Sequence, residues 1–231
     1  MRIEEMIQLM EGARDECRAN LPLESVALCY DLMIGYYRKI LDATGEKGGC
    51  VAAVGAYVPV ELLYALEFVP FHLEMHALNV TFLSGCLELL TAASEYGIPP
   101  EICSGQRAAA GLALQGLIPR PHLVINTALV CDPAIKTFEV VGKRFGCPTF
   151  FLDQPYLFDE AGLRYYGKEL EKLVAFLEAE TGRKLDWRRL EQTVSLCREA
   201  TLLYREVGEL RKAIPSPVRN IDSFNHCMIY L

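Results

Sequence analysis

The sequence has 231 residues, of which 52% are hydrophobic and 23% are charged, so it carries enough apolar material to bury a substantial core. Its formal net charge of −7 repels polyanions and no basic patch stands out, which argues against a nucleic-acid partner. The longest apolar runs, such as LVINTALVC, are much shorter than the roughly 20 residues that a membrane-spanning helix needs, so no membrane role is expected.

The cysteines indicate a reducing compartment. There are nine of them, and the N-terminal segment MRIEEMIQLMEGARDE has neither the apolar core nor the cleavage site of a signal peptide. We therefore expect a cytoplasmic protein with free thiols. No CxxC pair occurs, so the sequence lacks the closely spaced zinc-ribbon and thioredoxin signatures.

Apolar residues at intervals of three and four predict two helices, at 3–18 and 24–43, before any strand. The chain then alternates between the two kinds of element. In order we predict a strand at 49–57, a helix at 59–68, a strand at 68–75, a helix at 86–97, a helix that starts at Cys103, a strand at 122–130, a helix at 133–146 and a strand at 148–153. This alternation predicts an α/β fold, a Rossmann-like parallel sheet with helices on both faces.

Two long amphipathic helices are predicted near the end of the chain, at 163–182 and 186–214. Gly182 marks the turn between them, and Asp186 is a suitable N-cap for the second. The expected domain organisation is a helical lead-in at 1–45, a Rossmann-like lobe at 46–157, and a helical segment at 158–231.

Two cysteines stand where predicted helices begin, at the expected carboxyl edge of the sheet: Cys103 in EICSGQRAAAG and Cys131 in LVCDPAIK. Ligands of open parallel sheets bind at this edge, and a helix N-terminus stabilises a thiolate. The pair suits a soft metal centre, with Arg107 and Lys136 one turn inside the helices to offset charge. Spacing alone favours burial as small apolar residues, and two thiolates do not complete a metal site.

The other candidate site residues also have ordinary structural explanations. Glu61 in YVPVELLYA occupies a first helical turn, where many ordinary acidic residues occur. His72 and His76 in FHLEMH share a face and could bind zinc, although strand-edge histidines without a ligand are the favoured interpretation. Among the remaining cysteines, Cys147 precedes a strand and so lies at the wrong edge to serve as a third ligand. No GxGxxG, Walker or GxSxG motif is present.

The ordered set GAYVPVELLYALEFVP, EICSGQRAAAG, VCDPAIK and PTFFLDQPY, followed by LEAETGRKLD and IPSPVRNIDSF, resembles the 2-hydroxyacyl-CoA dehydratase and benzoyl-CoA reductase family. The resemblance runs from about residue 45 to the last residue. Within the family, the chain is similar to a subunit like the D-component of 2-hydroxyglutaryl-CoA dehydratase, of which it resembles the N-terminal lobe only.

The resemblance implies a cofactor and several partners. Such subunits consist of paired Rossmann-like lobes, hold a [4Fe-4S] cluster through three cysteines, and work with a related second subunit or as homodimers. An ATP-dependent iron–sulfur activator protein supplies a low-potential electron. In the dehydratases that electron makes a ketyl radical from a 2-hydroxyacyl-CoA thioester, so that the β proton and hydroxide leave to give an enoyl-CoA.

By the same resemblance, Cys103 and Cys131 match cluster ligands, whereas Glu61 and Ser104 match positions near the reacting substrate. The third cysteine ligand is expected outside this chain, since nothing around Cys227 marks it as a replacement. The implied function is that of a lyase or reductase subunit in anaerobic acyl-CoA metabolism. The main alternative is a non-catalytic lobe that docks an acyl-CoA or a subunit without a cluster. An unrelated zinc or thiol enzyme ranks last.

Overall fold

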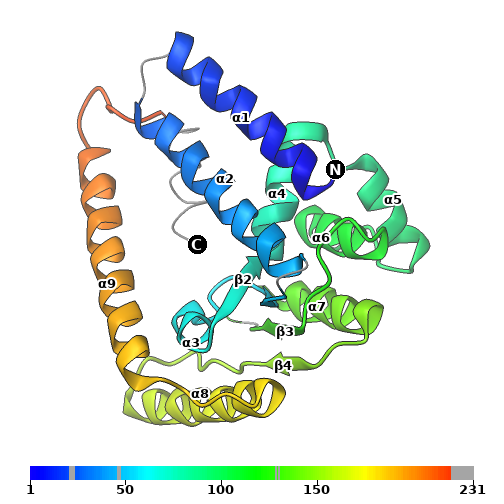
Figure 1. Cartoon of the computed structure of the whole chain (residues 1–231), viewed down its shortest axis with the longest axis vertical. Helices are drawn as coiled ribbons and strands as arrows, with labels where there is room; N and C mark the ends of the chain where they lie inside the picture. Colours follow the sequence, from blue (N-terminus) through cyan, green and yellow to red (C-terminus); the bar gives the residue numbers. More distant parts are fainter. Residues whose placement is uncertain (21–23, 46–47, 128, 130, 220–231) are drawn as a thin grey trace.

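The structure is a computed structural model that describes residues 1–20, 24–45, 48–127, 129 and 131–219 (Figure 1). Its elements are α1 (Ile3–Asn20), α2 (Glu24–Thr44), β1 (Cys50–Val54), α3 (Val60–Ala65), β2 (Phe68–His72), α4 (Leu73–Ser84), α5 (Leu87–Glu95), α6 (Ser104–Leu114), β3 (Leu123–Asn126), α7 (Asp132–Phe145), β4 (Thr149–Phe151), α8 (Glu160–Thr181) and α9 (Trp187–Leu210). The predicted α/β class, with a helical N-terminal region and long C-terminal helices, is confirmed.

The strands of the described residues form one four-stranded parallel sheet in the order β2-β1-β3-β4. Val54, the last residue of β1, is paired with His72 of β2 and with Ile125 of β3, so the carboxyl ends of these strands share one edge. The chain order reverses between β1 and β3. The crevice outside such a reversal is the usual ligand site of an open α/β sheet.

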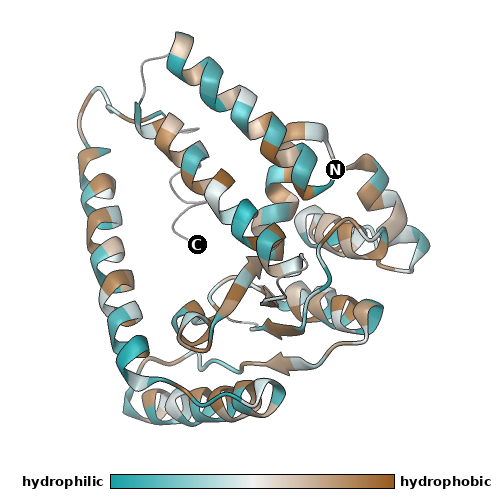
Figure 2. Ribbon diagram, in the orientation of Figure 1, coloured by the Kyte–Doolittle hydropathy of each residue, from teal (hydrophilic) through white to brown (hydrophobic). Residues whose placement is uncertain are grey.

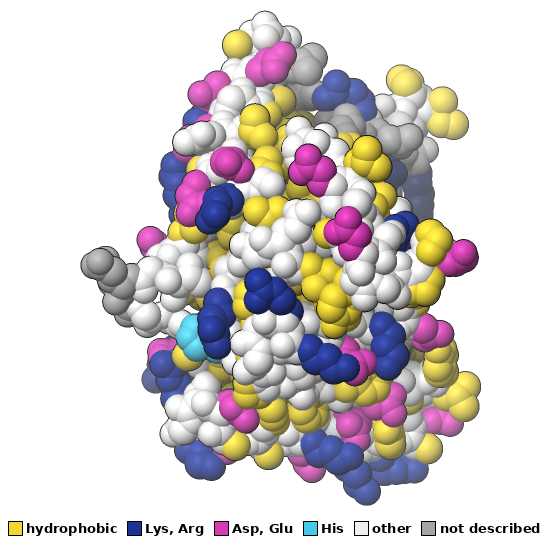
Figure 3. Space-filling view, turned by 90° about the vertical axis from the view of Figure 1, so that its right-hand side faces the viewer, with side chains coloured by type: hydrophobic (Ala, Val, Ile, Leu, Met, Phe, Trp, Pro, Cys, Tyr) yellow, Lys and Arg dark blue, Asp and Glu magenta, His cyan; other side chains and the backbone are white. Residues whose placement is uncertain are grey.

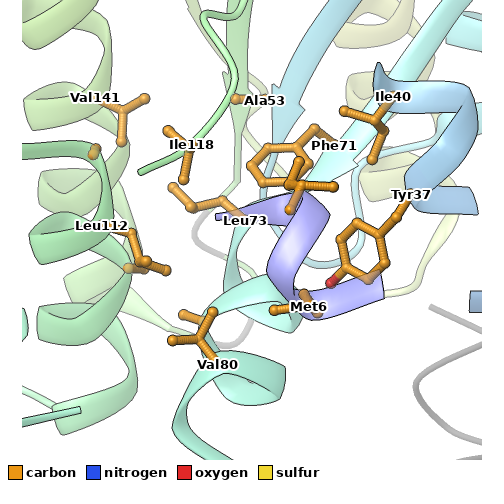
Figure 4. Packing of buried hydrophobic residues seen from close by; sticks show 14 of the residues in the cluster. Met6, Tyr37, Ile40, Ala53, Phe71, Leu73, Val80, Leu112, Ile118 and Val141 are labelled. Atoms are coloured by element: carbon orange, nitrogen blue, oxygen red, sulfur yellow. The ribbon is translucent and has the colours of Figure 1, made fainter. Parts of the chain in front are cut away.

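Side chains alternate between the two faces of the sheet. Val51 and Ala53 of β1 belong to a core with residues of α1, α2, α4, α6 and α7, whereas Ala52 and Val54 face a second core with residues of α3 and α8. Figure 4 shows the first core, where Tyr37 and Phe71 lie among aliphatic side chains. In Figure 2, hydrophilic and hydrophobic residues alternate along α8 and α9. Burial on both faces explains the continuous apolar sequences of the inner strands β1 and β3, whereas the edge strand β4 is largely exposed.

The ends of the long helices carry local signals that the sequence analysis identified. Asp186 caps α9 by accepting hydrogen bonds from the backbone N–H groups of Arg188 and Arg189, at 3.0 and 3.1 Å. Gly146 and Gly182 follow α7 and α8 in the left-handed conformation, with φ values of 61° and 67°. These caps confirm the predicted ends of both helices and the predicted N-cap at Asp186.

One predicted strand was wrong at its end. The strand proposed for 68–75 stops at His72, and Leu73 begins α4, a helix that the sequence analysis did not predict. The β2 strand passes into α4 without an intervening turn, and His72 provides no side-chain cap. Glu74 therefore lies in the first turn of a helix at the carboxyl edge of the sheet.

One face of the molecule carries charges of both signs. On the face in Figure 3, Lys and Arg side chains are interspersed with Asp and Glu side chains and with apolar patches. Within the described ranges, no helix is both long and apolar enough to cross a membrane.

Candidate functional site

Both predicted cysteines cap helices. Cys103 is the N-cap of α6 and is exposed, and Cys131 is the N-cap of α7 and is half-buried. Burial raises the pKa of the Cys131 thiol, and the negative charges of Glu74 and Cys103 raise it further. The first turn of α6, which Cys103 precedes, also contacts Cys131 directly, because Gln106 lies 3.6 Å from the Cys131 sulfur. The fold thus brings together two helix starts that are 28 positions apart in the sequence.

A buried amide connects the cysteine pair to the sheet. Gln106, which is 5% exposed, donates from Nε2 to Glu74 Oε1 and to the Cys131 sulfur at 3.6 Å. Glu74 Oε2 in turn accepts from the backbone N–H of Ala56 at 2.7 Å, just after β1. Sequence reasoning missed both Gln106 and Glu74. The signal that could have found the first was a glutamine that precedes the Ala-rich part of a helix by one residue, three positions after Cys103.

The basic residues expected beside the cysteines are engaged elsewhere. Arg107 points to α5, where its Nη2 donates to the Leu90 carbonyl at 3.1 Å and to Ser94 Oγ at 2.5 Å. Lys136 pairs with Glu139 at 3.0 Å on the exposed side of α7. The prediction that these two cations offset thiolate charge is therefore not supported, and the polar neighbour of Cys131 is an amide.

The described residues do not form a complete metal site. They include no group of three or more His, Cys, Asp or Glu side chains that could hold a metal ion. Cys86 caps α5, Cys147 precedes β4 at the amino edge, and Cys227 lies outside the described residues. Cys103 and Cys131 fit two ligand positions of an iron–sulfur cluster, because both are thiols at helix N-termini and one of them is open to solvent.

Glu61 lies in a large cavity of about 1630 Å³. Its walls come from α2, α3, α4, α8 and α9 and from the chain that follows β1. Cys197 of α9 lines the same cavity, where burial and the negative charge of Glu61 raise the pKa of its thiol to about 11. The Cys197 thiol is therefore neutral near pH 7. Neither Cys103 nor Cys131 lines this cavity, and Ser104 is an exposed residue at the start of α6.

The cavity and the cysteine site meet at the carboxyl edge of the sheet. Tyr57, Met75 and Leu129 line the cavity. Their near neighbours in sequence, Ala56, Glu74 and Cys131, belong to the hydrogen-bonded cysteine site. The segments that follow β1, β2 and β3 thus each contribute one residue to the cavity wall and one to the cysteine site.

The two histidines of FHLEMH also line the cavity, but they are neutral. Burial lowers the pKa of His72 to about 4 and that of His76 to about 3. His76 Nδ1 lies 3.2 Å from the hydroxyl of Tyr37, and His72 Nδ1 has no hydrogen-bond partner among the described residues. The two rings do not join a third ligand in the described part of the chain, so a zinc centre finds no support there.

The fold and the site define an α/β protein with a parallel sheet, and with a thiol pair and a cavity at the reversal of strand order. Comparison with family models gives the particular family. The model for the D-component of 2-hydroxyglutaryl-CoA dehydratase matches residues 55–231, more than half of the chain, so this chain belongs to that family. The family predicted from the sequence motifs is confirmed.

Curated relatives agree. The chain is 22% identical over 203 residues to lactoyl-CoA dehydratase subunit alpha of Anaerotignum propionicum. The aligned region covers 78% of this chain and 48% of that relative. The chain is 24% identical over 195 residues to the (R)-phenyllactyl-CoA dehydratase alpha subunit of Clostridium sporogenes, with 80% and 47% coverage. A benzoyl-CoA reductase subunit of Thauera aromatica is 25% identical over 203 residues, with 81% and 46% coverage. The chain thus spans about half the length of these relatives.

Proposed function

We propose that this chain is a lobe of an acyl-CoA dehydratase or reductase subunit, which binds the acyl-CoA thioester in the large cavity and contributes Cys103 and Cys131 to an iron–sulfur cluster. The meeting of cavity and thiol pair carries the proposal. Three strand-following segments each place one residue in the cavity wall and another in the cysteine site. A thioester in the cavity would have its reacting end next to an electron donor.

The residues of the chain have separate tasks in this proposal. Cys103 and Cys131 are cluster ligands; when bound, the cluster supplies single-electron transfer. Glu61 accepts or relays a proton of the substrate, because it lines the cavity beside a thiol that stays neutral near pH 7. Ser104 lies beside Cys103 and donates a hydrogen bond to the cluster or the substrate. The apolar walls exclude water from the reacting end.

The remaining parts of the enzyme come from elsewhere. The two ligands described here leave the cluster incomplete, so a third cysteine is proposed outside this chain. The relatives named above are subunits, which supports a partner subunit, either related or identical. An ATP-dependent iron–sulfur activator is the proposed electron source, and we place the whole system in the cytoplasm.

Anaerobic iron and sulfide analysis tests the proposal. It should be made on the longest expressed form of the protein that contains this chain, with Cys103→Ala, Cys131→Ala and the matched control Cys147→Ala at the opposite edge of the sheet. We expect iron and sulfide in the parent and the control, and loss of both in the two site variants. A parent protein without iron or visible absorbance would contradict the cluster, and the remaining function would be a cavity that docks an acyl-CoA.

A second measurement separates the carboxylate from the cluster. Glu61→Gln removes the proton acceptor and keeps the size of the side chain, so iron content should stay unchanged while turnover falls by about 10² to 10⁴. Assays with lactoyl-CoA, phenyllactyl-CoA and benzoyl-CoA, the thioesters in the names of the relatives, then distinguish a dehydratase from a reductase. An unchanged turnover in Glu61→Gln would remove Glu61 from the reaction.

A further inference from the structure

The amide of Gln106 has a fixed orientation. Its nitrogen carries two N–H donors. The two acceptors, Glu74 Oε1 and the Cys131 sulfur, are both on the side of that nitrogen. Its oxygen is buried and has no partner among the described residues. The reversed amide would direct that oxygen at a carboxylate and a sulfur, neither of which has a proton to give when ionised. Glu74 therefore determines which end of the amide meets Cys131.

Glu74 suits this task because a carboxylate accepts on both sides. One oxygen accepts from Gln106 and the other accepts from the backbone N–H of Ala56 at 2.7 Å. A glutamine at this position has a single acceptor oxygen and would have to give up one of these bonds. The carboxylate thereby ties Gln106 to the loop after β1, the loop that also leads into the helix of Glu61.

We propose that Gln106 is a positioning residue which donates an N–H hydrogen bond to the Cys131 thiolate of the cluster, and that Glu74 holds its amide in the donating orientation. The inference rests on the proposed function. Side chains behind the ligands of a metal site orient those ligands and tune the metal. Hydrogen bonds to the ligating sulfurs are one of the levers that set the potential of an iron–sulfur cluster.

The expected direction follows from charge. A reduced cluster carries one more negative charge than an oxidised one, so an N–H donor stabilises the reduced form more. Removal of the Gln106 donor should therefore make the cluster harder to reduce. We expect about a tenfold lower ratio of reduced to oxidised cluster at a fixed applied potential, which for one electron corresponds to about 59 mV.

The test is a redox titration followed by EPR on the cluster-loaded protein, in its longest expressed form. Gln106→Met keeps an unbranched side chain of similar length and removes both donors. Glu74→Gln keeps the size of that side chain and disturbs the amide indirectly. Gln115→Leu is the matched control, because Gln115 ends the same helix and its Nε2 donates to the Glu88 carbonyl at 3.4 Å. Gln106→Met should lower the reduced fraction, and the control should not. Glu74→Gln also removes a negative charge near Cys131, which by itself favours reduction, so its effect on the amide is measured by NMR.

A measurement without iron covers the case of poor loading. In this chain, the side-chain amide protons of Gln106 should shift in NMR spectra of Cys131→Ala and of Glu74→Gln, and remain in place in Cys147→Ala. Identical Gln106 signals in all of these proteins would overturn the contact itself.

The two failures can be told apart. Iron that binds normally but has the same potential in Gln106→Met as in Gln115→Leu overturns this inference and leaves the proposed function standing. A parent protein that binds no iron overturns the proposed function, and the positioning role falls with it.

Discussion

The burial of His76 predicts a loss of stability on mild acidification. The ring is 1% exposed and packs against Phe71 and Tyr37, with centroid distances of 5.1 and 5.6 Å. Burial, together with the positive charge of the chain's N-terminus, lowers its pKa to about 3. The unfolded chain binds a proton at this histidine below its ordinary pKa of about 6.5, whereas the folded chain stays neutral.

The sign and size follow from linkage. Because the folded pKa lies below the unfolded one, the stability is fully present above pH 6.5 and is lost as the pH falls toward the folded value. Between pH 6.5 and pH 5 the loss amounts to about 1.5 pKa units, or about 2 kcal/mol. His76→Phe keeps an aromatic ring in the cluster and cannot titrate, so it should lack this part of the acid sensitivity.

The assay is urea unfolding followed by far-UV circular dichroism, for the parent and His76→Phe at pH 7.5 and pH 5. The quantity of interest is the difference between the two proteins in their pH-dependent change of unfolding free energy. His72, whose pKa burial lowers to about 4, is present in both proteins and cancels from that difference. Equal pH dependence in parent and variant would show that the His76 ring is protonated in the folded state, and would refute the buried, neutral assignment.

Two further predictions test packing and the cavity. Gly111→Ala should lower the free energy of unfolding by about 1–3 kcal/mol, because the added β-carbon would overlap the Leu89 carbonyl oxygen. Gly167→Ala has open space around the added β-carbon and should raise the free energy of unfolding by about 0.5–1 kcal/mol. Chemical denaturation measures both, and the reverse order would contradict the close packing of α5 on α6. Glu61→Gln should lower the pKa of Cys197 from about 11 and speed its alkylation by iodoacetamide at pH 8.5, followed by peptide mass spectrometry. An unchanged rate would mean that the Glu61 carboxylate does not raise the pKa of the Cys197 thiol.

The features that sequence alone predicts well are those with a local cause. Asp186 caps a helix because its short carboxylate reaches the next free N–H groups, and Gly182 ends a helix because it adopts a positive φ without strain. The helix starts at Cys103 and Cys131 were likewise predictable from the residues around them. Each of these depends on a few neighbours in the chain.

The helix α4 was missed because its local pattern is ambiguous. In the segment LEMHALNVTFLS, polar and apolar residues are spread around all sides of the helix, so no clear stripe appears at helical spacing. The segment also follows β2 without a Gly or Pro to mark the change. As part of a strand, Glu74 had no reason to approach Cys131. Once Glu74 is in the first turn of a helix at the carboxyl edge, its carboxylate reaches both Gln106 and Ala56.

The contacts between distant segments explain why the site was only half predictable. Cys103 and Cys131 could be identified individually, but Gln106 becomes functionally interesting only when α4, α6 and α7 converge on it. A buried glutamine among alanines costs free energy unless its donors are satisfied, and here one of the two acceptors is a cysteine sulfur. These two hydrogen bonds stabilise Gln106 in its buried position, and both acceptors come from distant segments that no local sequence pattern reveals. The same convergence ties the thiol pair to the loop before Glu61, so the electron-transfer and proton-transfer parts of the proposed site depend on one shared scaffold.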